Sequence, residues 1–393
     1  MSTEPPARAW IEIRGQALRR NLRVLRDAAA PGTRLIGMVK ADGYGLGALP
    51  IARILLEEGV QALGVACVEE GIRLRGAGFE CPILVFSGVP PGGEVAALDA
   101  GLTLCISDLD GLERVGRVAR ERSDGSATSG TEVGVGASIH LEVDTGIGRA
   151  GFPAVAVDHW APELSRWLGE GLRLTGIFTH FHSADEAMPV RERTMAAQRT
   201  TFDGVLRRLA RDGIMPEDGP DWRHLANSAA ILGGGSRAGE GVRPGIFLYG
   251  GGVGEGLPRP DPVIAVRARV VRTVDVPAGT TQGYGATYRA KGPERWATLG
   301  IGYGDGLPRI LSNRGVVLVA GRRVPIIGRI SMDVTVVDIT ELPGVQTGDV
   351  ATVIGSDGGE EITVDEVAEC AQTISYEILT GWTPRLRRRW EMD

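Results

Sequence analysis

Two hydrophobic patterns divide the chain. Over roughly the first 250 residues, short runs rich in Val, Ile and Leu alternate with segments whose apolar residues recur every three or four positions. The runs are typical of buried strands, and the spaced segments are typical of amphipathic helices. The first helix is expected at residues 16–28, where Leu18, Leu22 and Leu25 form one stripe. Eight strands are expected, at residues 34–39, 62–67, 82–86, 102–106, 138–143, 174–179, 223–227 and 245–249.

The number of these units indicates the fold class. Eight strand-then-helix units predict an α/β chain whose residues 11–254 form a (β/α)8 TIM-type barrel. A doubly wound open sheet is the alternative, and the count of eight favours the barrel. Further helices are expected at residues 108–120 and 188–212. A stretch rich in Gly, Ser and Thr at 122–136 predicts a surface insertion before the fifth strand.

Beyond residue 254 the pattern changes to short β-branched runs separated by glycine turns. This predicts a mainly β C-terminal domain at 255–393, with one short helix near 365–372. The N-terminal residues 1–10, which contain part of the run AWIEI, are expected to add a strand to this domain and to bring the chain ends together. The final RLRRRW is interpreted as a last strand with solvated arginines.

Composition narrows the class of protein. The chain has 393 residues, 43% of them hydrophobic, and a formal net charge of −6. These values favour a globular protein and argue against a nucleic-acid or anionic-membrane partner. No apolar run approaches the ~18–20 residues of a membrane-spanning helix, and the N-terminus lacks a signal pattern. Cys67, Cys81, Cys105 and Cys370 have no metal-binding spacing, so we expect a cytoplasmic protein without a metal site.

Lysine is rare in this chain. Of 43 basic residues only Lys40 and Lys291 are lysines. Arginine cannot replace lysine as a nucleophile or proton carrier, because its guanidinium stays protonated. A lysine retained in an arginine-rich chain is therefore a candidate functional amine. Lys40 directly follows the first expected strand and precedes a glycine-rich loop, whereas Lys291 lies in a polar turn.

Polar residues follow several other expected strands, at the end of a barrel where catalytic groups lie. They are Glu142, Asp144 and Arg149 after the fifth strand, His180 and His182 after the sixth, Asn227 and Ser228 after the seventh, and Arg243, Gly245 and Ile246 around the eighth. Barrel enzymes often bind phosphate with the loops after strands seven and eight. A lysine opposite a phosphate pocket fits a pyridoxal phosphate site or a sugar-phosphate aldolase, and this chemistry leaves both open.

Several segments in order carry a more specific signal. They are MVKADGYGLGA (38–48), LEVDTGIGRAGF (141–152), GIFTHF (176–181), VRPGIFLYG (242–250), GYGATYRA (283–290), VPIIGRISMDVTVVD (324–338) and TISYEILT (373–380). With these motifs the chain resembles, over essentially its whole length, alanine racemase, a fold-type III pyridoxal phosphate enzyme. The resemblance implies a homodimer with shared active sites that interconverts L- and D-alanine and supplies D-alanine for peptidoglycan.

The resemblance also assigns residue roles. Lys40 would carry pyridoxal 5'-phosphate and act as one base, and Tyr284 from the second subunit would be the other. Arg243 would face the pyridine nitrogen and leave it unprotonated, with His224 hydrogen-bonded to Arg243. The other expected cofactor contacts are Tyr44, His180, Ser228, Gly245, Ile246 and Tyr376. The expected substrate contacts are Arg149 and, from the second subunit, Met332.

Two positions depart from the family pattern. Glu142 stands where many members carry a carbamylated lysine, and we expect its carboxylate to orient Arg149 directly or through a water. His182 stands where a small residue is more usual, either on a surface loop or at the entrance to the site. Alternative functions are a serine or broad-specificity racemase, a fold-type III decarboxylase and a non-catalytic cofactor-binding protein. Arg243 argues against the decarboxylase, and the β domain with Tyr284 argues against the binding protein.

Overall fold

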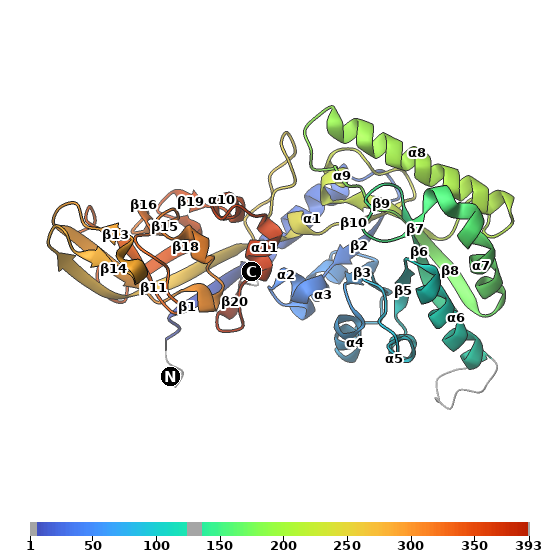
Figure 1. Ribbon diagram of the computed structural model, residues 1–393, viewed down its shortest axis with the longest axis horizontal. Coiled ribbons are helices and arrows are strands. Elements are labelled where there is room, and N and C mark those ends of the chain that lie inside the picture. The colour runs from blue at the N-terminus through green and yellow to red at the C-terminus, as the bar shows by residue number, and fades with distance from the viewer. Residues whose placement is uncertain (1–5, 124–135, 392–393) are drawn as a thin grey trace.

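The computed structural model describes residues 6–123 and 136–391 and shows two lobes side by side (Figure 1). One lobe is a barrel surrounded by helices, and the other is built mainly of strands. Most of the insertion predicted at 122–136 lies outside the described residues. Among the described residues, no helix is both long and apolar enough to cross a membrane.

Eight parallel strands form the barrel. They are β2 (Arg34–Met38), β3 (Ala62–Val65), β4 (Ile83–Val85), β5 (Thr103–Ile106), β6 (Ala137–Asp144), β8 (Leu172–Phe178), β9 (Trp222–Asn227) and β10 (Gly241–Arg243). Each pairs with its neighbours in the order β5-β4-β3-β2-β10-β9-β8-β6, and pairing of β5 with β6 closes the ring. The short β7 (Phe152–Pro153) pairs with the end of β6. The predicted TIM-type barrel is confirmed.

Helices surround the barrel, as the three-to-four spacing predicts. They are α1 (Gly15–Ala28), α3 (Ala48–Glu57), α4 (Val68–Gly76), α5 (Glu94–Asp99), α6 (Leu109–Ser123), α7 (Val157–Gly169), α8 (Val190–Arg211) and α9 (Ser228–Leu232). In α1 the predicted stripe of Leu18, Leu22 and Leu25 is fully buried. Each such leucine contributes roughly 1.5–3 kcal/mol of burial free energy, which holds α1 in place.

The predicted eighth strand at 245–249 is wrong. The strand is β10, which ends at Arg243, and Ile246–Tyr249 form the 3-10 turn η2. Pro244 follows the strand and has no N–H to continue a ladder. All four η2 residues are buried, and a short run buried on every side has the same hydrophobic signature as a strand. Arg243 therefore lies at the strand end, and Gly245 lies in the loop beyond it.

The second lobe contains a nine-stranded sheet. Its strands are β1 (Ala9–Arg14), β11 (Ile264–Val276), β14 (Glu294–Leu299), β15 (Val316–Val319), β16 (Arg322–Pro325), β17 (Thr335–Asp338), β18 (Val350–Asp357), β19 (Glu360–Ile362) and β20 (Arg387–Glu391). β12 (Thr281–Gln282) and β13 (Tyr288–Arg289) form a separate pair. The predicted short helix is α10 (Val364–Cys370), and α11 (Ser375–Thr380) was not expected.

The two ends of the chain meet in this sheet. β1 runs antiparallel to β11 and parallel to β20, with Trp10 opposite Arg387. This confirms the predicted N-terminal strand in the β domain, and its pairing with β20 brings the chain ends together as expected. The expectation that every arginine of RLRRRW is solvated is wrong, because the guanidinium of Arg388 donates to the carbonyls of Gly45 and Trp382.

Candidate active site

Lys40 lies at the mouth of the barrel, where β2 passes into α2 (Lys40–Tyr44). The residues after it form a left-handed turn, with φ of 53° at Ala41, 51° at Asp42, 63° at Gly43 and 54° at Tyr44. A left-handed conformation costs roughly 1–2 kcal/mol for each L-residue. Such a turn persists only where the surrounding contacts hold it, and it determines how Lys40 enters the site.

The surroundings of Lys40 favour its neutral amine. Burial lowers the pKa of Lys40, and the positive charges of Arg149 and Arg243 lower it further. The carboxylate of Glu70 acts in the opposite direction. Because only a neutral amine can attack a carbonyl or accept a proton, this environment suits Lys40 to nucleophilic and base chemistry.

Arg243 is the centre of a buried hydrogen-bond network. Its Nη1 donates to Nδ1 of His224 at 2.7 Å and to the His224 carbonyl at 2.7 Å. Its Nη2 donates to the carbonyls of Thr179 and Leu225 and to Nδ1 of His180 at 3.1 Å. Arginine only donates, so Nδ1 of both histidines must accept and carry no proton. Burial lowers the pKa of Arg243 to about 10, while the charge of Glu142 opposes that shift.

His140 extends this network and was missed in the sequence. His224 uses Nδ1 to accept from Arg243, so its Nε2 carries the proton and donates to Nδ1 of His140 at 2.8 Å. His140 packs against Gly176, where an added Cβ would come within 2.4 Å of the imidazole. Strand alternation could have pointed to His140 from the sequence, because His140 and Glu142 are two residues apart in β6 and therefore share one face.

The buried histidines predict an acid limit for stability. Burial, together with the charge of Arg243, lowers the pKa of both His140 and His180 to about 3 and places that of His224 well below its ordinary value. Below about pH 6.5 the unfolded chain therefore binds protons that the folded chain excludes, and stability falls as pH falls toward 3. We expect unfolding free energy, measured by urea titration, to be about 4 kcal/mol lower at about pH 5.5 than at about pH 7.5.

A matched variant isolates one of these groups. His140→Gln keeps a hydrogen-bond acceptor for His224 but cannot titrate. The acid slope, meaning the fall in unfolding free energy as pH is lowered, should therefore become smaller by about one third. The slope is the readout, since the absolute stability of the variant also reflects altered packing. Equal slopes in the variant and the wild type would show that His140 is not the titrating group.

The loops after β9 and β10 form a compact polar cradle. Gly245 donates its N–H to Oγ of Ser228 at 2.8 Å. A Cβ added at Gly245 would lie 2.6 Å from the hydroxyl of Tyr44, so only glycine fits between them. Ile246 is buried directly beyond Gly245. The hydroxyls of Ser228 and Tyr44 and a backbone N–H are groups that bind phosphate oxygens.

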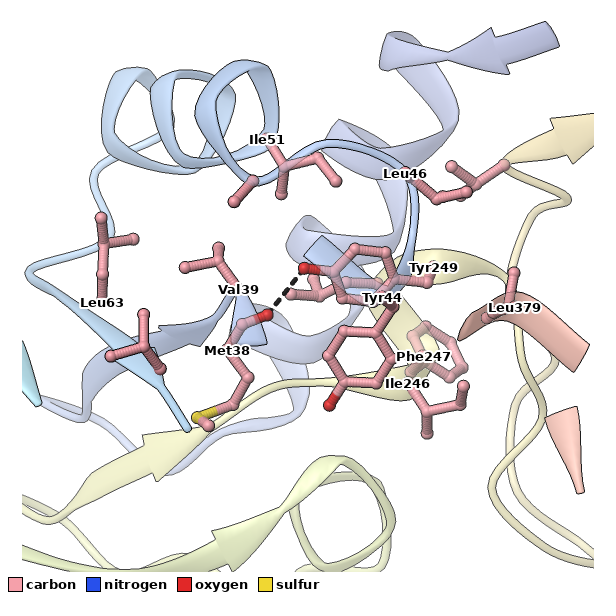
Figure 2. Packing of buried hydrophobic residues seen from close by; sticks show 14 of the residues in the cluster. Met38, Val39, Tyr44, Leu46, Ile51, Leu63, Ile246, Phe247, Tyr249 and Leu379 are labelled. Atoms are coloured by element: carbon pink, nitrogen blue, oxygen red, sulfur yellow. Dashed lines mark hydrogen bonds between the residues drawn. The ribbon is translucent and has the colours of Figure 1, made fainter. Parts of the chain in front are cut away.

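Tyr44 is held in this cradle by two other tyrosines. Figure 2 shows Tyr44 stacked on Tyr249, with ring centroids 4.2 Å apart, and the Tyr249 hydroxyl donating to the carbonyl of Met38 at 2.7 Å. Tyr376, from α11, lies 6.0 Å from Tyr44 between ring centroids. The structure thus brings Tyr44, Ser228, Gly245 and Tyr376 into one neighbourhood, although they come from four separate segments.

Of the two contacts expected between Glu142 and Arg149, direct or through a water, the direct one is not made. Its buried carboxylate accepts from the Ser107 hydroxyl at 2.7 Å, and no hydrogen bond or ion pair joins it to Arg149 in the described part of the chain. Ser107 follows β5, the strand next to β6, and so lies within reach. Arg149 lies in the loop beyond β6 and is exposed. Ser107 was missed because strand neighbours are not visible in a single sequence.

His182 lies on the wall of a cavity as well as on an exposed loop. Its Nδ1 pairs with the Ser183 hydroxyl at 2.6 Å, and its backbone N–H donates to the side chain of Gln198. The cavity, of about 540 Å³, is also lined by His180 and Tyr376. The two expectations for His182 are therefore compatible, since the loop borders this cavity.

Tyr284 and Met332 lie apart from these barrel residues in the other lobe. The side chain of Tyr284 is 70% exposed and that of Met332 is 52% exposed. Tyr284 begins the turn η3 (Tyr284–Ala286), and β13 soon after it lies at the end of the β lobe away from the barrel (Figure 1). One chain by itself therefore does not bring Tyr284 to its own Lys40.

Comparison with known proteins relates this arrangement to a family. The model for the alanine racemase N-terminal domain matches residues 13–252, and the model for the C-terminal domain matches residues 263–390. The chain belongs to the alanine racemase family. Members of this family are isomerases, and the site described above is the candidate active site of such an enzyme.

Individual members agree over their full length. An alanine racemase from Symbiobacterium thermophilum is 39% identical over 383 residues, which is 96% of each chain. The crystal structure of alanine racemase from D-cycloserine-producing Streptomyces lavendulae superposes with a TM-score of 0.89 at 33% identity, covering 99% of this chain and 98% of that one. The crystal structure of alanine racemase from Bartonella henselae, with covalently bound pyridoxal phosphate, superposes with a TM-score of 0.83 at 28% sequence identity. The match covers 98% of this chain and 100% of that one.

Proposed function

We propose that this chain interconverts L- and D-alanine with pyridoxal 5'-phosphate attached to Lys40. The observation that carries the proposal is a lysine with a lowered pKa in the same barrel mouth as the cradle of Ser228, Gly245 and Tyr44. When bound, the cofactor would supply an electron sink that acidifies the Cα–H bond of the substrate. In a bacterial cell the D-alanine would supply peptidoglycan synthesis.

The residues present fit this cofactor. Lys40 offers an amine for covalent attachment, and the cradle offers two hydroxyls and a position where a Cβ would collide with Tyr44. Tyr376 would complete the phosphate contacts, with the backbone of Ile246 beside Gly245. His180 would lie against the cofactor ring, where Nδ1 is already committed to Arg243. These assignments follow the family resemblance, and their geometry in this chain supports them.

Arg243 would hold the pyridine nitrogen with an N–H donor. A guanidinium rarely releases its proton, and even the lowered pKa of about 10 leaves Arg243 charged near neutral pH. The ring nitrogen would then stay unprotonated, which limits carbanion stabilisation and disfavours decarboxylation. His224 and His140 keep Arg243 aligned through the fixed sequence of donors described above.

Two bases on opposite faces of the substrate Cα would invert its configuration. Lys40 would remove or return the Cα proton on one face, and Tyr284 of a second subunit would do so on the other. Arg149 and the second subunit's Met332 would contact the substrate carboxylate. Glu142 would orient Arg149 through a water, because its direct contact goes to Ser107.

The β lobe supports a homodimer in which each subunit completes the other's site. Tyr284, Tyr303 and Met332 expose large side chains on this lobe. They lie close together, because the N–H of Tyr303 donates to the Ser331 carbonyl and the turn holding Tyr284 packs against Arg329. Exposed apolar clusters of this kind mark interaction surfaces. Tyr303 was not singled out in the sequence, although it lies in the motif GIGYGDG.

A substrate panel tests the proposed reaction. The purified holoenzyme is incubated with L-alanine, L-serine and other L-amino acids, and D-enantiomers and CO₂ are measured by chiral chromatography and gas release. We expect D-alanine to form fastest, with no CO₂. Faster racemisation of serine would instead assign a different substrate, and CO₂ release would assign a decarboxylase.

A further inference from the structure

The left-handed turn after Lys40 is held on one side by Glu70 of α4. Oε1 of Glu70 accepts the N–H of Ala41 at 2.6 Å and that of Asp42 at 3.4 Å, and Oε2 accepts the N–H of Ala66 at 2.8 Å. The N–H of Ala41 belongs to the peptide group that Lys40 itself begins. Glu70 therefore fixes the orientation of the peptide plane on the C-terminal side of Lys40.

The turn is held on its other side by Arg388 of β20. Nε and Nη2 of Arg388 donate to the carbonyl of Gly45 at 3.2 Å and 2.9 Å. The remaining N–H groups donate to the carbonyls of Trp382, Thr383 and Leu386, which fixes the guanidinium itself. Gly45 in turn donates its N–H to the carbonyl of Ala41 at 2.8 Å. Arg388 is thereby connected to the Ala41–Asp42 peptide group, whose N–H lies 3.4 Å from Oε1 of Glu70 and which directly follows the peptide group of Lys40 and Ala41.

Packing confirms that this turn is confined. Gly45 has φ of 80°, and a Cβ there would lie 2.7 Å from the carbonyl oxygen of Leu379 in α11. Figure 1 shows α2 lying where the two lobes meet, beside α11 and β20. The barrel supplies Glu70 and the β lobe supplies Arg388, so the conformation after Lys40 depends on both lobes.

We propose that Glu70 and Arg388 are positioning residues that clamp the turn at residues 41–45 and thereby aim the amine of Lys40. This inference rests on the proposed role of Lys40. It also gives the β lobe a function in its own subunit's site, separate from the contribution of Tyr284 to a partner. Each residue acts through backbone atoms of the turn that follows Lys40.

Each clamp residue has a matched control in an adjacent position, Glu69 before Glu70 and Arg389 after Arg388. Glu70→Gln removes the charge and replaces one accepting oxygen with a donor that cannot bind an N–H. Glu69→Gln removes the same charge from the exposed neighbouring side chain. Arg388→Lys keeps the charge but loses the planar fork that reaches four carbonyls. Arg389→Lys makes the same change at a side chain that lies over Trp10.

The test combines kinetics with amide exchange. In Glu70→Gln and Arg388→Lys we expect kcat for L-alanine to fall at least ~10-fold while KM changes less than ~3-fold, because a misaimed base slows turnover without weakening binding. Exchange of the amides at residues 41–45, measured by mass spectrometry, should quicken at least ~10-fold. Borohydride labelling of Lys40 should remain complete. The control variants should match the wild type in all three measurements.

The possible failures are distinguishable. Wild-type kcat and wild-type exchange in both clamp variants would overturn the clamp, as would a loss of kcat with unchanged exchange at residues 41–45. A wild-type enzyme that is not labelled at Lys40 would overturn the proposed function, whatever the exchange results. If a variant fails to fold, amide exchange in the wild-type protein tests the clamp instead. The clamp requires the amides of Ala41 and Asp42 to be protected in the native protein, and fast exchange there would overturn it.

Discussion

Replacing Lys40 with arginine is expected to lower racemisation of L-alanine by at least ~10³-fold. Arginine keeps the positive charge and most of the length of lysine. It cannot become covalently attached to a carbonyl compound as a primary amine does, and it does not release a proton near neutral pH. The loss should therefore include both cofactor attachment and proton transfer, and kcat should show it directly.

The rarity of lysine makes this prediction easy to check. Borohydride reduction of the holoenzyme followed by peptide mapping can label one of only two lysines. We expect the label on Lys40, none in Lys40→Arg, and wild-type labelling and turnover in the control Lys291→Arg. A label on Lys291, or normal turnover without Lys40, would remove Lys40 from the mechanism.

Tyr284→Phe is expected to lower kcat/KM for both enantiomers of alanine by about 10²–10⁴-fold. The two values fall together because the equilibrium constant between enantiomers is one, which requires kcat/KM for L-alanine to equal kcat/KM for D-alanine. The bound cofactor's absorbance should remain, since Tyr284 is not among the residues of the cradle. One enantiomer should still exchange its Cα proton with deuterated water, because Lys40 continues to act on its own face.

A control lies in the same motif. Tyr288 donates its hydroxyl to Glu294 and packs edge-on against Trp296, so Tyr288→Phe should keep wild-type kinetics. Unchanged racemisation in Tyr284→Phe would refute the two-base assignment.

Mixing the two inactive variants tests whether sites are shared between subunits. Lys40→Arg and Tyr284→Phe chains, unfolded together and refolded, should form hybrid dimers in which one of the two sites has both bases intact. Random pairing then restores about one quarter of wild-type turnover. Hybrids without activity would mean that Lys40 and Tyr284 of one site come from the same chain, contrary to the exposed position of Tyr284.

Hydrophobic pattern predicted most of the fold, because the strands of a closed barrel are buried runs and its helices have one apolar face. It misplaced the eighth strand, since the buried turn Ile246–Tyr249 has the hydrophobicity of a strand. It also treated Arg388 as solvated, because a terminal arginine shows nothing in sequence of the carbonyls that it will meet. Lys40 stood out without any structure, through composition and its place after a strand.

Sequence by itself determined the alternation of strands and helices, the barrel class, the family resemblance and the choice of Lys40 as the candidate reactive lysine. These depend on residue type, periodicity and short motifs, all of which are local along the chain. Only the tertiary structure decided that His140 continues the network from Arg243, that Glu142 contacts Ser107, and that Glu70 and Arg388 hold the turn after Lys40. Such contacts join residues far apart in sequence, and a hydrogen bond depends on distance and direction in space.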